Sequence, residues 1–94
     1  LNESRFTESY IRSKKNRGTG PVKIRFELVK KGITNELINE QLFQVTHEEW
    51  LDNIQFQREK KYGKHLPDTI KEKARQSRFL YQRGFPVELI NYCC

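Results

Sequence analysis

Cysteine and long apolar runs are what this sequence most obviously lacks. Its 94 residues include two cysteines, Cys93 and Cys94, which are adjacent. Neighbouring α-carbons lie about 3.8 Å apart, closer than the roughly 4.4 Å that an unstrained disulfide needs, so we expect free thiols and a reducing, cytoplasmic setting. No stretch resembles a signal peptide or a membrane span, and we expect no membrane partner. Because the sequence starts at Leu1 and not at methionine, we expect a fragment of a longer protein.

Signals for catalysis or cofactor binding are also missing. His47, His65 and the two cysteines do not have the spacing of a zinc site. The glycines at 18 and 20 are not followed by the Gly-Lys-Ser/Thr of a phosphate-binding loop. Glu48 and Glu49 could be interpreted as paired carboxylates, but their place at a helix start also explains them. We expect a protein that is not an enzyme and that uses no metal or cofactor.

What the chain does contain is an internal repeat. The segment KGITNELIN at 31–39 is matched by RGFPVELIN at 83–91. A self-similarity at about fifty residues is typical of stacked helical modules, in which each copy leaves an apolar face for its neighbour to cover. Gly32 and Gly84 each follow a basic residue at the end of a helical pattern, where glycine adopts the left-handed conformation without steric cost. We therefore expect each copy to form the end of one helix, a glycine corner and the start of a second helix.

The fold class that follows is all-α, with two three-helix repeats stacked side by side at residues 1–45 and 46–94. Thr34 is expected to cap the third helix, and the spacing of Thr46 and Glu49 predicts a capping box at the fourth. Apolar periodicity and end signals predict six helices, at 3–16, 21–31, 34–43, 46–62, 68–83 and 86–94.

Several finer expectations follow from the same patterns. Pro21 and Pro86 are expected as first residues of their helices, and Asp68 as a cap after the turn at Leu66 and Pro67. The first helix should gather Phe6, Tyr10 and Ser13 on one side, and the fifth should align Ile70, Ala74, Ser77 and Tyr81, with Leu80 beside them. Matching Trp50 with Phe6 and Ile54 with Tyr10 places the eight extra residues of the second repeat at about 63–69. By register with Leu42, Cys94 is expected as small apolar filler.

The second helix carries two apolar stripes. Ile24 and Leu28 share one side, whereas Val22, Phe26 and Val29 lie on roughly the opposite side. One interpretation is a helix sandwiched between its own repeat and the next. The alternative is a partner-binding face built on Phe26.

Positive charge is arranged in bands, one in each repeat. Residues 12–31 hold eight basic residues and one acid, and residues 58–83 hold nine basic residues and three acids. Residues 32–57 hold five acids and no lysine or arginine. Such bands attract a polyanionic or acidic partner. The candidate partner-binding or DNA-binding residues are therefore Arg12, Lys14, Lys15, Arg17, Lys23, Arg25, Lys30, Lys31, Arg58, Lys60, Lys61, Lys64, Lys71, Arg75 and Arg78.

Several separate motifs together resemble the second and third repeats of the bacterial regulatory RecX family. They are the opening LNESRF with Glu8, Tyr10 and Ile11, then RGTGP at 17–21, Ile24, Glu27-Leu28, KGI at 31–33, RFL at 78–80 and RGF at 83–85. The resemblance covers nearly the whole chain, with the family's first repeat missing. It implies a non-catalytic regulator of recombination, DNA repair and the SOS response, which binds the RecA filament on DNA, mainly inhibits it, and has some DNA affinity of its own. We expect a monomer.

Two other functions remain open. Three short helices with a tight corner are compatible with a helix-turn-helix-like, non-specific DNA-binding module. Against it, the third helix of each repeat is acidic or uncharged, so only backbone contacts from the first two helices are expected. A purely structural repeat of the HEAT type also fits the repeat length, although the three-helix count and the two glycine corners favour the RecX-like interpretation.

Overall fold

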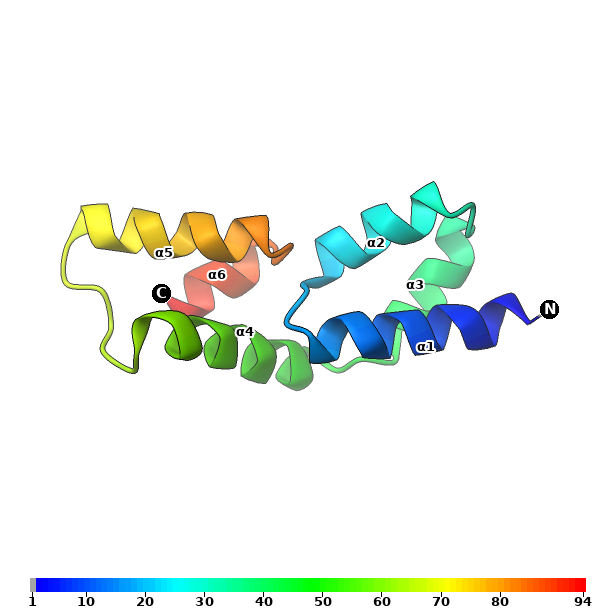
Figure 1. Cartoon of the computed structure of the whole chain (residues 1–94), viewed down its shortest axis with the longest axis horizontal. Coiled ribbons are helices and arrows are strands. Elements are labelled where there is room, and N and C mark those ends of the chain that lie inside the picture. Colours follow the sequence, from blue (N-terminus) through cyan, green and yellow to red (C-terminus); the bar gives the residue numbers. More distant parts are fainter. Residues whose placement is uncertain (1) are drawn as a thin grey trace.

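The computed structural model describes residues 2–94, and every regular element within that range is a helix (Figure 1). The first repeat consists of α1 (Glu3–Asn16), α2 (Pro21–Lys30) and α3 (Asn35–Phe43). The second consists of α4 (His47–Tyr62), α5 (Ile70–Gln82) and α6 (Val87–Cys93). The prediction of an all-α fold with two tandem three-helix repeats is confirmed. Leu1, the first residue of the opening motif, lies outside the described residues.

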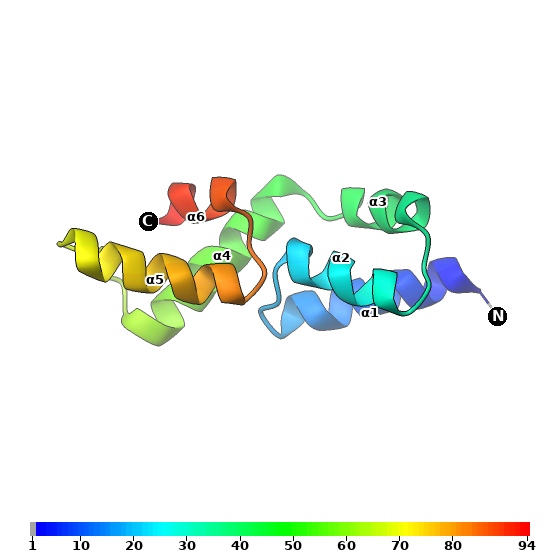
Figure 2. The ribbon, with the colours of Figure 1, turned by 90° about the horizontal axis from the view of Figure 1, so that it is seen from above.

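The two repeats lie side by side along one axis and form a rod of 49 × 19 × 18 Å. In Figure 1, α1 and α2 lie in front of α3, and α4 and α5 lie in front of α6. Figure 2 shows α3 and α6 along the same side of the rod. The main helix packing lies within each repeat. Buried side chains from both repeats nevertheless belong to one apolar cluster, from Ile11 in α1 to Ile90 in α6.

The glycine corners after α2 and α5 have the same hydrogen bonds. Gly32 donates to the Val29 carbonyl at 3.0 Å, and the next residue, Ile33, donates to the Leu28 carbonyl at 3.1 Å. After α5, Gly84 donates to the Tyr81 carbonyl at 3.0 Å, and Phe85 donates to the Leu80 carbonyl at 3.2 Å. With φ of 89° at Gly32 and 100° at Gly84, both are Schellman ends, a conformation that glycine adopts without strain. The repeated sequence therefore encodes a repeated corner.

Side-chain caps define most of the helix starts. Thr34 accepts from the Leu37 amide, and Thr46 and Glu49 form the predicted capping box. The prediction of Asp68 as a cap is wrong, because Thr69 accepts from the Glu72 amide and α5 begins after it. Pro86 is also not the first helical residue. Its ψ of 158° is extended, which makes it the residue before α6, whereas Pro21 does open α2.

The buried sides of α1 and α5 differ from the predicted ones. Thr7 and Ile11 are the buried residues of α1 and Phe6 is exposed, whereas Trp50 and Ile54 on α4 are buried, so the residues matched between the repeats differ in burial. On α5, the predicted line is mostly exposed, with Ile70 at 89% and Tyr81 at 66%. The side that packs inward carries Gln76 and Leu80. Leu80, which was predicted beside that line, is buried as expected, whereas Thr7 and Gln76 are polar residues that apolar periodicity does not select.

The eight extra residues of the second repeat are spread over two helices and the connection between them. α4 has 16 residues where α1 has 14, and α5 has 13 where α2 has 10. The connection at 63–69 is three residues longer than the one at 17–20. The prediction that all eight extra residues lie in this connection is therefore wrong for five of them.

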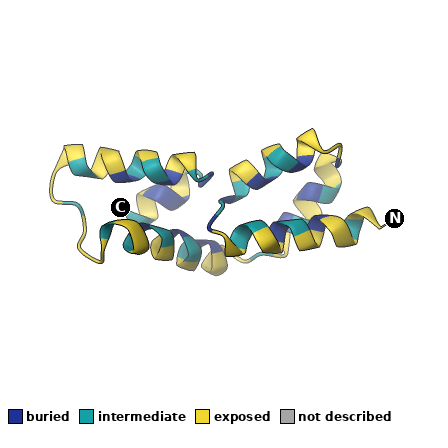
Figure 3. Cartoon of the chain, in the orientation of Figure 1, coloured by how far each residue is buried: buried dark blue, intermediate teal, exposed yellow. Residues whose placement is uncertain are grey.

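The outer stripe of α2 faces away from both repeats. Val22 is 53% exposed, Phe26 62% and Val29 47%, whereas Ile24 and Leu28 are fully buried. Figure 3 shows the alternation of exposed and buried residues along α2. The interpretation of α2 as a sandwiched helix is wrong, because the next repeat continues along the rod axis and does not cover this side.

Two connecting segments meet at the junction between the repeats. The Gly20 amide donates to the Arg83 carbonyl at 2.8 Å, and the Val22 amide donates to the Gly84 carbonyl at 2.9 Å. In the opposite direction, the Arg83 guanidinium donates to the carbonyls of Arg17 at 2.6 Å and Gly18 at 3.3 Å. A Cβ at Gly20 would overlap the backbone of Gly84, so the two segments touch without space for a side chain. The corner of the second repeat thus holds the α1–α2 connection of the first.

Both cysteines are free and half-buried, and they pack against the edge of the apolar cluster. Burial raises the pKa of the Cys93 thiol, against the opposing effect of the Arg58 guanidinium. A raised pKa leaves less thiolate at neutral pH, which agrees with a packing role.

Candidate partner-binding surface

Five of the fifteen candidate basic residues form ion pairs. Lys14 lies 3.7 Å from Glu27 on α2, and Lys15 lies 3.1 Å from Glu49 at the start of α4. The remaining pairs are Arg12 with Glu8 at 3.8 Å, Arg75 with Glu72 at 2.7 Å, and Arg58 with Glu59 at 3.9 Å. The Lys14 and Lys15 pairs connect α1 to two other helices, so these lysines also support the fold.

The other ten candidates have no carboxylate at ion-pair distance within residues 2–94. Apart from the half-buried Arg25, all of them are exposed. This set is what a negatively charged partner would meet first, because its charge is not compensated inside the chain. It consists of Arg17, Lys23, Arg25, Lys30, Lys31, Lys60, Lys61, Lys64, Lys71 and Arg78.

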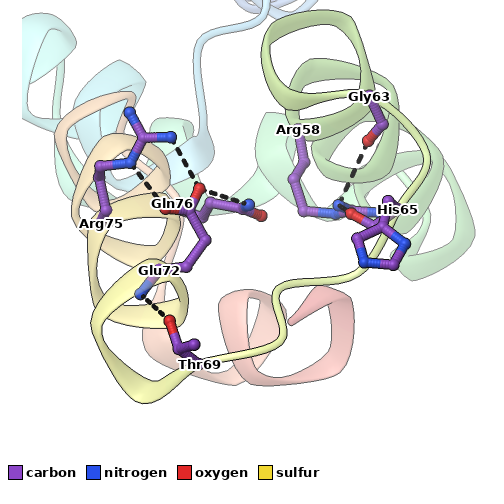
Figure 4. A network of polar contacts seen from close by, with 7 residues as sticks. All are labelled: Arg58, Gly63, His65, Thr69, Glu72, Arg75 and Gln76. Atoms are coloured by element: carbon purple, nitrogen blue, oxygen red, sulfur yellow. Dashed lines mark hydrogen bonds and ion pairs between the residues drawn. The ribbon is translucent and has the colours of Figure 1, made fainter.

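Arg58 does not lie on the surface, since only 2% of it is exposed. Figure 4 shows its guanidinium facing the α4–α5 connection, where Nη1 donates to the carbonyls of Gly63 at 3.5 Å and His65 at 3.4 Å. Arg58 therefore orders this connection from the inside and does not belong to the partner-binding set. The spacing of four from Trp50 to Ile54 to Arg58 is the sequence signal for its burial.

Near the other end of the connection, α5 begins with a second polar network, also drawn in Figure 4. Glu72 accepts from Arg75 Nη2 at 2.7 Å and from Nε at 3.0 Å, and Gln76 donates to the same carboxylate at 3.2 Å. These contacts, led by Arg75, lower the pKa of Glu72. Arg75 is exposed, but its charge is partly compensated by this carboxylate.

Aromatic rings next to the lysines were missed by the prediction from sequence. Lys14 and Lys31 lie over the ring of Tyr10, with Nζ 5.6 Å and 5.5 Å from its centroid, and Lys30 lies 5.2 Å from the centroid of Phe26. In the second repeat, Lys61 lies 4.4 Å from the centroid of the Phe79 ring. The i, i+4 spacing from Tyr10 to Lys14 and from Phe26 to Lys30 could have indicated two of these contacts.

Tyr10 also connects α1 to α2 through its hydroxyl group. The hydroxyl donates to Glu27 Oε1 at 2.7 Å. Burial, followed by the hydrogen bond and the negative charge of Glu27, raises the pKa of Tyr10 to about 12. Glu27 is the only acid in α2, and its contacts with Tyr10 and Lys14 direct it towards α1. The outer side of α2 is consequently left with basic and apolar residues alone.

Within residues 2–94, no three side chains from His, Cys, Asp and Glu gather closely enough to hold a metal ion. None of the helices in this range combines the length and the apolar character of a membrane span.

The architecture and the unpaired basic surface define a protein of the tandem helical-repeat class. The family model for the third three-helix domain of RecX matches residues 47–94, and that for the second three-helix domain matches residues 2–42. The chain belongs to the RecX family.

Curated relatives agree with this assignment. Proteins named "Regulatory protein RecX" are 37% identical over 90 residues in Halorhodospira halophila, 40% over 88 in Cronobacter sakazakii and 36% over 90 in Pseudomonas putida strain W619. These alignments cover 96%, 94% and 96% of this chain, but 55%, 53% and 57% of the relatives. The chain thus spans about half the length of the curated relatives it matches.

Proposed function

We propose that this chain is a non-catalytic regulator of recombination and DNA repair, which binds the RecA filament on DNA and mainly inhibits its activities. The observation that carries the proposal is the match of RecX family models to both repeats, together with relatives named as regulatory proteins. A monomer in the cytoplasm remains our prediction, as does the division into repeats at 1–45 and 46–94.

The shape and the charge of the rod support a filament as the partner. A rod 49 Å long is extended enough to contact more than one subunit of a polymer at once. The ten unpaired basic residues of the candidate set would face acidic protein surface or phosphate in the groove of such a filament. A rod bound across neighbouring subunits would hinder filament growth and turnover.

The alternative is a DNA-binding module that needs no filament. A helix-turn-helix domain inserts its recognition helix into the major groove. Here α3 carries Glu36 and Glu40 with no basic residue, and α6 carries Glu88 with none, so phosphate would repel both. Non-specific contacts with the DNA backbone, made by the basic residues of the other helices, form the secondary activity in our proposal.

A salt titration tests the proposal against this alternative. The chain is titrated into fluorescent single-stranded DNA, naked or coated with RecA, and binding is followed by anisotropy over increasing salt. We expect weak, steeply salt-dependent binding to naked DNA, because each neutralised phosphate releases counterions. Binding to the coated DNA should persist at higher salt, because protein contacts contribute to it. Equal affinities for both at every salt concentration would support the simple DNA-binding module.

A further inference from the structure

The outer face of α2 is apolar in the middle. At about 100° per residue, Val22, Phe26 and Val29 lie within about 60° of one another around the helix axis. All three side chains are about half exposed or more. Ile24 and Leu28, on the opposite side of the same helix, are fully buried. An exposed apolar stripe on a small domain is a common mark of an interaction site.

The two edges of this stripe are basic. Lys23 and Lys30 follow one edge and Arg25 the other, and none of them has a carboxylate at ion-pair distance in the described part of the chain. The Lys30 ammonium lies 5.2 Å from the centroid of the Phe26 ring, so the charge stands directly beside the apolar centre. Because the one acid of α2 points towards α1, nothing negative interrupts the surface.

We propose that this face of α2 docks an acidic amphipathic segment of the protein partner, with apolar residues against Val22, Phe26 and Val29 and acidic residues beside Lys23, Arg25 and Lys30. The inference rests on the proposed function and specifies the part of the chain that contacts RecA protein. Phe26 is the anchor, because it offers the largest apolar area and lies between the two valines.

The chemistry of the stripe favours protein over nucleic acid or a second copy. Single-stranded DNA binds platforms on which bases stack, and the two valines that flank Phe26 offer no such ring. A second copy docking by the same face would oppose its own Lys23, Arg25 and Lys30 with like charges. An acidic segment with apolar residues on one side complements both the centre and the edges.

Phe26→Ala tests the anchor, and Phe56→Ala on α4 is a matched control. Both phenylalanines are 62% exposed, so neither substitution should disturb folding, which circular dichroism would check. Phe56 has Asp52 one turn earlier, whereas Phe26 is bordered by basic residues. We expect Phe26→Ala to weaken binding to RecA-coated DNA about tenfold and Phe56→Ala to change it less than about twofold. Binding to naked DNA should remain the same for both variants.

Photocrosslinking identifies the occupant directly. With benzoylphenylalanine in place of Phe26, we expect a crosslink to an acidic segment of a RecA subunit, and none from the same probe in place of Phe56. Equal filament affinities of the two alanine variants, or a crosslink from position 26 to DNA, would overturn the inference and leave the proposed function standing. A wild-type chain that does not bind the coated DNA would refute both.

Discussion

Gly84 is the residue at which the second repeat holds the first. Gly84 and Gly32 both have a positive φ and make equivalent hydrogen bonds, so each ends its helix in the same way. Their surroundings differ. A Cβ at Gly84 would overlap Lys23, including its backbone, whereas a Cβ at Gly32 would meet nothing within 4 Å. Gly84 therefore requires glycine both for its positive φ and for its close contact with Lys23, whereas Gly32 requires it for φ alone.

This difference predicts unequal costs for the same substitution. Gly32→Ala should lower the free energy of unfolding by about 1 kcal/mol, through the strain of a left-handed alanine alone. Gly84→Ala should cost at least about 2 kcal/mol more, because the backbones at the junction must also separate. Urea denaturation of the two variants measures both values. Equal destabilisation would contradict the close approach of Gly84 to Lys23.

At the scale of the elements, connecting segments join the two repeats more than helix faces do. The segment at 17–20 donates through Gly20 and accepts through Arg17 and Gly18, and Val22 at the start of α2 also donates to the second repeat. The Arg83 side chain donates to the carbonyls of Arg17 and Gly18, directly after α1. We expect the repeats to unfold together because of these contacts and the shared apolar cluster.

Arg83→Met tests this junction, with Arg78→Met as the control on the same helix. Removing the guanidinium leaves the Arg17 and Gly18 carbonyls without these donors, which should cost about 1 to 2 kcal/mol of stability. Arg78 is exposed and has no ion-pair partner in the described residues, so its substitution should change stability by less than about 0.5 kcal/mol. The variants are compared by thermal and urea unfolding. A control as damaging as Arg83→Met would show that the loss is not specific to the junction.

Helix ends could be predicted from sequence better than helix faces. Thr34 and Thr46, with the glycines after α2 and α5, act within a few residues of their own position, so local chemistry determined them. The buried side of α1 could not be predicted from such local signals. Thr7 and Ile11 are no more apolar together than Phe6 and Tyr10, and the packing of α3 against α1 decides between them.

At the scale of the whole molecule, the candidate surface could be predicted only in outline. The charge bands are visible in the sequence, but the pairing of Lys15 with Glu49 joins residues 34 positions apart, and no local pattern indicates it. The burial of Arg58 depends in the same way on the connection that folds back over it. The rod that results carries unpaired basic residues in both repeats and one exposed apolar stripe on α2.

The growth of RecA filaments on single-stranded DNA in the presence of this chain tests the proposed regulation directly. Assembly is followed by fluorescence from labelled DNA, with the chain at well below one copy per RecA subunit. We predict slower extension, because one rod bound across neighbouring subunits hinders further addition, and a smaller effect for Phe26→Ala than for Phe56→Ala. Assembly curves that superimpose with and without the chain, even at one copy per subunit, would refute the proposed regulation of the filament.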